Sequence, residues 1–156
     1  MAYQFSIMTQ AQAETIAYDW HYPGEYSFYN IESDQEDMEE FLDPEKRGDS
    51  MLAVTAEGEL IGFFSAAEKE QGVYEIGLGM RPDLTGRGSG RSFLAACMTI
   101  LQEKKAPGVI ALSVALFNVR AIKVYRSCGF RDGEQFNQST NGGSYPFLKM
   151  YYHCGS

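Results

Sequence analysis

The sequence predicts one α/β (α+β) domain in which helices flank a mixed β-sheet. The chain has 156 residues, a length that suits a single domain with a sizeable core. Segments with the periodicity of strands alternate with segments of helical periodicity along the whole chain. No linker, repeat or low-complexity stretch divides the sequence. We therefore expect one domain over residues 1–154, and we interpret Gly155-Ser156 as a remnant of cloning.

The elements are expected in the order β-α-α-β-β-β-α-β-α-β-β. They are a strand over 3–7, helices over 11–20 and 34–42, strands over 51–55, 60–67 and 73–80, a helix over 90–105, a strand over 109–117, a helix over 118–127, and strands over 130–136 and 145–152.

The elements of the N-terminal half are marked by alternation, capping residues and turn residues. The first strand alternates apolar and polar side chains, as a half-buried strand does. The acidic helix is expected to begin at Ser33 or Asp34, both of which are N-cap residue types, and to stop at Asp43-Pro44. Glu57-Gly58 predicts the turn of a β-hairpin.

In the C-terminal half, the helix over 90–105 is the best-marked element. It ends at Lys104-Lys105, ahead of Pro107-Gly108. Arg81-Pro82 closes the strand before it, and the following helix exits through Cys128-Gly129. The expected buried face of the long helix consists of Phe93, Leu94, Cys97, Met98 and Leu101.

The composition argues against several classes of protein. The three Cys form no CxxC pair, and only His21 and His153 could add ligands, so we expect no metal site. Scattered thiols predict a reduced, cytoplasmic protein. No apolar run approaches the ~18 residues of a membrane span, and the first residues lack the features of a signal peptide, so no membrane partner is expected. A net charge of −8 argues against nucleic acid as a partner.

Charge is divided unevenly along the chain. Residues 1–75 hold 17 Asp and Glu against three Lys and Arg, whereas residues 76–156 hold four against ten. Such a chain could hold a polyanionic ligand through its basic half and a cationic one through its acidic half. A solvated helix face is the alternative explanation for the acidic stretch between Asp34 and Glu40.

A glycine-rich loop between a strand and a helix is the most informative segment. Gly86, Gly88 and Gly90 let consecutive backbone N–H groups turn toward one point where the helix begins. The helix N-terminus adds unpaired donors, and Arg87 and Arg91 add full positive charges, so the loop predicts a phosphate cradle. A flexible turn is the alternative. A Walker loop would need a Gly-Lys-Ser/Thr ending, and a Rossmann fingerprint belongs to a first βα unit, so neither fits.

A second motif, Asn118-Val-Arg-Ala-Ile-Lys-Val-Tyr-Arg-Ser-Cys-Gly-Phe130, follows the next strand. Together with the glycine loop, it resembles the GNAT superfamily of acyl-CoA-dependent N-acetyltransferases. Members of this family typically carry Val-x-Pro-x-x-Gln/Arg-x-x-Gly-x-Gly/Ala, and here the segment over 80–90 reads Met-Arg-Pro-Asp-Leu-Thr-Gly-Arg-Gly-Ser-Gly. The family's second pattern, after the next strand, is Asn-x-x-Ala-x-x-x-Tyr-x-x-x-Gly-Phe. It matches here at Asn118, Ala121, Tyr125, Gly129 and Phe130.

The resemblance implies a GNAT-like fold in which two parallel strands, here 73–80 and 109–116, splay apart to admit acetyl-CoA as acetyl donor. The pantetheine arm would pair with the first strand, as in β-augmentation. Tyr125 would point at the sulfur. The implied donor-binding residues are Leu78, Gly79 and Met80 for the pantetheine and thioester, Gly86, Arg87, Gly88, Ser89, Gly90 and Arg91 for the pyrophosphate, and Asn118 for the pantetheine.

Two positions depart from the family's patterns. Thr85 stands where members usually carry Gln or Arg, which removes one polar arm from the loop. Members that acetylate the N-termini of ribosomal proteins carry a Glu in the strand before the Asn, and Ser113 holds that position here. Their general base is therefore not carried over.

The reaction implied is direct attack of an amine on the thioester within a ternary complex. The amides of Leu78 and Met80 would stabilise the oxyanion. Tyr125 is the candidate group for the leaving thiolate. Because free tyrosine is a weaker acid than a thiol, it would act mainly by hydrogen bonding or pass on a proton from the amine. Glu75, on the same strand as the thioester-binding residues, is the candidate base.

The acceptor is expected to be an amine, cationic in character, under the aromatic and then acidic segment over 20–42. Tyr22, Glu25, Tyr26 and Tyr29 would frame it through cation–π and charge contacts, unless these aromatics simply anchor a loop on the core. A small polyamine and a basic peptide fit the acidic N-terminal half equally well as acceptors. A different class of function, an acyl-CoA-binding sensor or interaction module without catalysis, stays open, and so does a homodimer.

Overall fold

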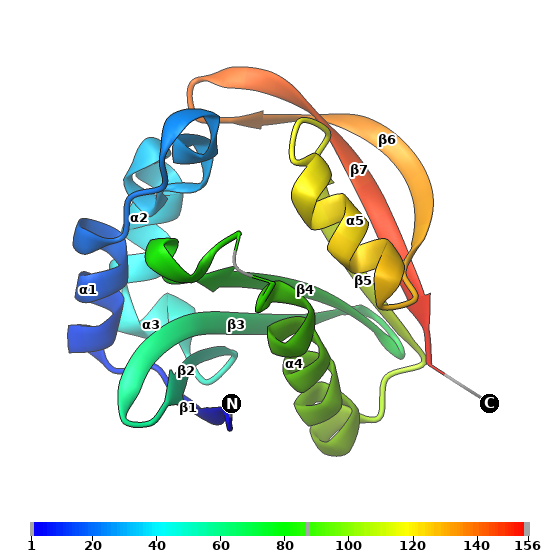
Figure 1. The fold of residues 1–156 in the computed structure, drawn as a ribbon, viewed down its shortest axis with the longest axis horizontal. Coiled ribbons are helices and arrows are strands. Elements are labelled where there is room, and N and C mark those ends of the chain that lie inside the picture. Colours follow the sequence, from blue (N-terminus) through cyan, green and yellow to red (C-terminus); the bar gives the residue numbers. More distant parts are fainter. Residues whose placement is uncertain (1, 87, 155–156) are drawn as a thin grey trace. The chain divides into compact units, whose positions relative to one another are not determined.

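The computed structural model describes residues 2–86 and 88–154 (Figure 1). Its strands are β1 (Gln4–Ile7), β2 (Met51–Ala56), β3 (Glu59–Glu70), β4 (Val73–Met80), β5 (Val109–Ala115), β6 (Arg131–Thr140) and β7 (Gly143–His153). Its α-helices are α1 (Gln10–Asp19), α2 (Gln35–Leu42), α3 (Pro44–Arg47), α4 (Gly90–Lys105) and α5 (Val119–Ser127). Short 3₁₀-helices are η1 (Gly24–Tyr29), η2 (Ile31–Ser33) and η3 (Pro82–Leu84).

The seven strands form one mixed sheet in the order β1-β2-β3-β4-β5-β7-β6. Strands β1 and β2 pair antiparallel, as do β2 and β3 and, further along, β5 and β7. Strands β4 and β5 pair in parallel, with Val73–Glu75 opposite Val109–Ala111. The predicted fold class, a mixed sheet flanked by helices, is confirmed, and the predicted order of strands and longer helices is confirmed with it.

The chain forms two compact units, each built from three segments. The first unit comprises Met1–Ser65, Leu78–Thr85 and Ser139–Ser144, and the second comprises Ala66–Gly77, Gly86–Gln138 and Tyr145–Ser156. Strands β3 and β4 each contribute residues to both units. Each candidate functional residue therefore belongs to one unit or the other.

An aromatic core organises the first unit. Helix α1 begins with a capping box between Thr9 and Gln12 and buries one small apolar face. The ring of Phe63 lies 6.4 Å from that of Trp20 and 5.8 Å from that of Phe41, measured between centroids. Trp20 and Phe41 are both almost completely buried. The start of the aromatic segment is thus part of the core.

In the second unit, α4 buries the face that its periodicity predicts, which consists of Phe93, Leu94, Cys97, Met98 and Leu101. Helices α4 and α5 contact each other. After α5, the ring of Phe130 lies 5.6 Å from that of Tyr152 on β7. This packing fixes the start of α4 and the whole of α5, which carry the two sequence motifs.

The structure adds elements to the prediction rather than removing any. Asp43-Pro44 stops α2 as expected, but the same pair starts α3, since Asp43 caps it and Pro44 occupies its first turn. Asp34, one of the two predicted caps of the acidic helix, is its N-cap. The expected strands over 60–67 and 130–136 extend to Glu70 and Thr140.

Candidate functional site

The glycine loop lies in the second unit and leads directly into α4. Gly86 and Gly88 have φ values of +73° and +79°, in the left-handed region that favours glycine. Ser89 is the N-cap of α4, and Gly90 is its first residue. The first N–H groups of a helix have no partner within the helix, so this end offers donors and a partial positive charge. Arg87 lies outside the described residues.

Arg120, on the first turn of α5, is a basic residue that lies beside this loop and was not predicted from the sequence. A Cβ on Gly86 would lie 2.9 Å from the Nη1 atom of Arg120, so the guanidinium lies directly beside the glycine. Arg91, which was predicted, places its Nη2 atom 3.5 Å from the carbonyl oxygen of Ser127 at the other end of α5. The signal for Arg120 was its position two residues after Asn118, in the second motif.

The second motif shapes α5. Asn118 is the N-cap of this helix, and its Oδ1 atom accepts a hydrogen bond of 3.2 Å from the Ala121 amide. The ring of Tyr125 lies 5.9 Å from that of Phe130. The Phe130 amide donates to the Tyr125 carbonyl oxygen at 3.0 Å. Four of the five motif residues are thus joined in two pairs, Asn118 with Ala121 at the start of α5 and Tyr125 with Phe130 at its end.

Glu75, the candidate base, lies on β4 in the second unit and forms an ion pair. Its Oε2 atom is 3.0 Å from the Nζ atom of Lys149 on β7. The Glu75 side chain is 34% exposed and that of Lys149 is 20% exposed, so the pair is partly shielded from water. Lys149 pairs with Ser113 in the β5–β7 ladder. The sequence analysis missed this cation, because the strand that carries it is distant from Glu75 in sequence.

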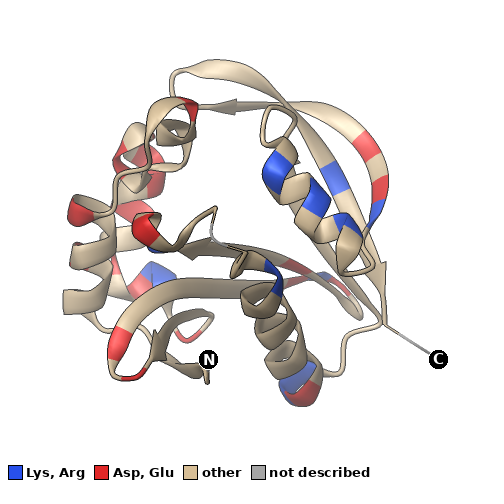
Figure 2. Cartoon of the chain, viewed as in Figure 1, with Lys and Arg blue, Asp and Glu red and all other residues tan. Residues whose placement is uncertain are grey.

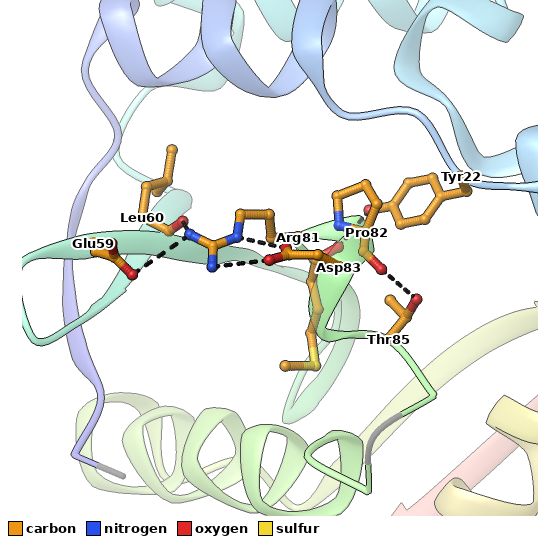
Figure 3. Close-up of polar contacts among 8 residues, drawn as sticks. Tyr22, Glu59, Leu60, Arg81, Pro82, Asp83 and Thr85 are labelled. Atoms are coloured by element: carbon orange, nitrogen blue, oxygen red, sulfur yellow. Dashed lines mark hydrogen bonds and ion pairs between the residues drawn. The ribbon is translucent and has the colours of Figure 1, made fainter.

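In the first unit, the end of β4 is tied to the aromatic segment. The hydroxyl of Tyr22 donates a 2.6 Å hydrogen bond to the carbonyl oxygen of Met80 (Figure 3). The Arg81 amide donates to the carbonyl oxygen of Ile61 on β3 at 2.8 Å. Burial raises the pKa of the Tyr22 phenol. Tyr22, predicted to contact the acceptor, therefore has its hydroxyl engaged with backbone.

Arg81 and Thr85 close the turn that follows β4 (Figure 3). The guanidinium of Arg81 makes two hydrogen bonds to the carboxylate of Asp83, at 2.6 and 3.2 Å, and its Nη1 atom lies 3.8 Å from a carboxylate oxygen of Glu59. Thr85, the departure from the family's pattern, donates from its hydroxyl to the carbonyl oxygen of Pro82 at 2.7 Å. It thus closes the turn of η3.

The other residues predicted for the acceptor lie on η1 in the first unit. Glu25, in the first turn of η1, is exposed, whereas Tyr26 and Tyr29 are partly buried. The ring of Tyr29 packs edge-on against that of Phe28, with the centroids 5.3 Å apart. The acidic stretch that follows forms α2. Figure 2 shows acidic positions along α2 and basic positions along α5.

Asp34 joins the start of α2 to the turn between β6 and β7, all within the first unit. Its carboxylate accepts from the amides of Asp37 and Asn141, at 3.0 and 2.8 Å, and from the hydroxyl of Thr140 at 3.2 Å. These hydrogen bonds, with that from the Asp37 amide foremost, lower the pKa of Asp34. Asn141 also donates from Nδ2 to the carbonyl oxygen of Phe28 at 2.8 Å.

Across residues 2–86 and 88–154, no cluster of three or more His, Cys, Asp or Glu is placed to hold a metal ion. Within the same ranges, no helix has the length and apolar character needed to cross a membrane.

Comparison with known proteins places these motifs in a family. The model of the acetyltransferase (GNAT) family matches residues 15–130. A curated relative, the mycothiol acetyltransferase of Paenarthrobacter aurescens, is 32% identical over 116 residues, which cover 70% of this chain. This chain spans about a third of the length of that relative, with 35% of it covered.

Solved structures share the fold over nearly the whole chain. A spermidine N-acetyltransferase from Vibrio cholerae, solved with CoA and spermine, has a TM-score of 0.74 and 19% identity, with 97% of this chain and 95% of that one covered. The aminoglycoside acetyltransferase AAC(6')-Ib, solved with ribostamycin and coenzyme A, has a TM-score of 0.75 and 20% identity, with 98% and 94% covered.

Proposed function

This chain belongs to the acetyltransferase (GNAT) family, and we propose on that basis that it moves an acetyl group from acetyl-CoA to an amine by direct attack in a ternary complex. The observation that carries the proposal is the pair of motifs within the matched residues 15–130: the glycine loop that starts α4 and the Asn118 motif of α5.

The loop suits the phosphates of acetyl-CoA. Gly86 lies beside the Arg120 guanidinium, and the residues from Gly88 to Arg91 lead into the N-terminus of α4. We assign the pyrophosphate to these backbone amides, with Gly88, Ser89, Gly90 and Arg91 among them. For the pantetheine and thioester we assign the backbone of Leu78, Gly79 and Met80 and the side chain of Asn118, whose Nδ2 group would donate while Oδ1 caps α5.

When bound, acetyl-CoA supplies the acetyl group as a thioester, and the chain must meet three chemical needs. The amides of Leu78 and Met80 would donate to the oxygen that gains negative charge. Tyr125 would hydrogen-bond the leaving sulfur. An alkylammonium with a pKa of ~10.4 must lose a proton before it can attack, and Glu75 is our candidate to accept it, directly or through water. Lys149, 3.0 Å from the Glu75 carboxylate, would restrain its orientation for that task.

The acceptor in this proposal is a cationic amine. The first unit holds 15 acidic side chains against three basic ones, which favours a positively charged ligand there. Glu25, Tyr26 and Tyr29 are the proposed contacts, through charge and the faces of aromatic rings. Spermidine and aminoglycosides, after which the enzymes of the similar structures are named, are themselves amines. A basic peptide remains the competing acceptor.

The proposed location of the reaction is the cytoplasm. All three Cys are free thiols, one buried and two partly buried, and free thiols persist in reducing compartments.

Thermal unfolding with and without acetyl-CoA tests the proposal, with ATP and NAD at matched concentrations as controls. Acetyl-CoA at ~100 times its Kd should add about 2.7 kcal/mol to the free energy of unfolding, which raises Tm by several degrees. No shift with acetyl-CoA would overturn the proposal. A shift without turnover of spermidine-like amines or basic peptides would favour the acyl-CoA-binding sensor instead.

A further inference from the structure

The peptide group between Met80 and Arg81 is held at both of its ends. In a trans peptide, the carbonyl and the N–H point in opposite directions. The Arg81 N–H donates to the carbonyl oxygen of Ile61 on β3. The Met80 carbonyl, on the other side, accepts from the hydroxyl of Tyr22 (Figure 3). At 2.8 and 2.6 Å, both hydrogen bonds are short. Rotation of this peptide would have to break one of them, so its orientation is set jointly by the sheet and by the aromatic segment.

This restraint also fixes the direction of the preceding amide. Met80 is the last residue of β4, and in an extended residue the N–H and the carbonyl point toward the same edge of the strand. The Met80 N–H therefore points to the side on which Tyr22 holds the carbonyl, away from β3. This N–H is one of the two donors to which the proposed function assigns the oxygen of the thioester.

Tyr22 is itself held in place and stays a donor. Its backbone amide donates to the Oδ1 atom of Asn30 at 2.8 Å. Burial raises its pKa, so the phenol keeps its proton through the neutral pH range. The residue after this peptide, Arg81, donates two hydrogen bonds from its guanidinium to the carboxylate of Asp83. The hydroxyl of Tyr22 is thus held in place and stays a hydrogen-bond donor at neutral pH.

We propose that Tyr22 is a positioning residue: its hydroxyl holds the Met80 carbonyl and so aims the Met80 N–H at the thioester oxygen, which couples the aromatic segment to the acetyl-transfer step. The inference rests on the proposed function for the role of the Met80 N–H. It assigns Tyr22 a part in turnover and not, as the sequence suggested, in holding the amine.

Amide hydrogen exchange in the ligand-free protein tests the restraint itself. Tyr22→Phe keeps the ring and removes only the donor, and Tyr18→Phe, at an exposed tyrosine on α1, is the matched control. Exchange in peptides that cover 78–85 should be several-fold faster in Tyr22→Phe and unchanged in Tyr18→Phe. Equal exchange in Tyr22→Phe and the unsubstituted protein overturns the inference. If Tyr22→Phe does not fold, Asn30→Ala, which frees the Tyr22 backbone, should accelerate the same peptides, and no acceleration counts against the inference.

The second measurement is the infrared carbonyl stretch of bound ¹³C-acetyl-CoA. Hydrogen bonding lowers this frequency, so Tyr22→Phe should lose part of the downshift seen in the unsubstituted protein. kcat should fall about tenfold while the KM of the amine changes less than twofold. A raised amine KM with unchanged kcat overturns the positioning role in favour of acceptor binding. If acetyl-CoA does not bind the unsubstituted protein, the proposed function fails, while the exchange result still decides whether Tyr22 restrains the peptide.

Discussion

Tyr125 is the side chain on which the proposed chemistry depends most directly. Its ring is held against Phe130, and its backbone carbonyl accepts from the Phe130 amide, so replacing the hydroxyl alone should leave the packing of α5 intact. We predict that Tyr125→Phe lowers kcat tenfold or more, since the leaving thiolate loses its hydrogen bond. Steady-state kinetics measure the loss, and the thermal shift with acetyl-CoA should be retained. Unchanged turnover would remove Tyr125 from the mechanism.

Gly79 meets a packing requirement that its own segment does not reveal. The resemblance implies that its backbone contacts the pantetheine and thioester, and this stays a prediction. In the structure, a Cβ on Gly79 would lie 2.5 Å from the ring of Phe63, which packs against Trp20 and Phe41. The glycine thus makes room for a core ring. A neighbour on another strand imposes this requirement, and no local pattern in the sequence contains it.

At the scale of elements, Asp34 is both the cap of α2 and the anchor of the turn between β6 and β7. We predict that Asp34→Ala lowers Tm at pH 7, because it removes hydrogen bonds to Asp37, Thr140 and Asn141 together. Asp49→Ala, at an exposed carboxylate outside the helices and strands, is the control and should change Tm little.

The same replacement has a predicted pH dependence. The pKa of Asp34 is lower in the folded protein than its ordinary value of 3.8. Its contribution to stability is therefore fully present above that value and is lost as pH falls through the folded-state pKa. The difference in Tm between the unsubstituted protein and Asp34→Ala should shrink below about pH 4. A difference that stays constant from pH 7 to pH 3 would contradict this linkage.

The sequence predicted most elements because their signals are local. The apolar face of α4, the Asp34 cap and the turn at Glu57-Gly58 each lie within a few residues of the structure that they cause. The sequence did not predict Arg120 against Gly86, Lys149 beside Glu75 or the Tyr22 hydroxyl on Met80. Each of these contacts joins residues more than 30 positions apart, and only the folded chain brings them together.

At the scale of the whole molecule, charge is divided between the two units. The first unit has 15 acidic and three basic side chains, and the second has six acidic and ten basic ones. A polycationic acceptor would be attracted to the first unit by many charges at once. Salt would screen this attraction, because the Debye length falls from ~10 Å at 0.1 M to ~3 Å at 1 M.

We therefore predict that the KM of a spermidine-like acceptor rises several-fold between low and high salt when acetyl-CoA is saturating. The KM of a monoamine of similar size should rise less, because this acceptor carries only one positive charge. The KM values of the two acceptors, measured across a salt series, check this prediction. Equal salt dependence for the two would show that the acidic surface has no part in acceptor binding.

The bond between Asp34 and Asn141 also sets an order of events during synthesis. The two residues are 107 positions apart, and a ribosome adds about 5 to 20 residues per second, so Asp34 waits roughly 5 to 20 s for its partner to be made. The aromatic and acidic segments therefore leave the ribosome before the turn between β6 and β7, to which Phe28 and Asp34 are hydrogen-bonded, has been made. The first unit can close only after residues 139–144, more than 100 positions beyond Asp34, have been made.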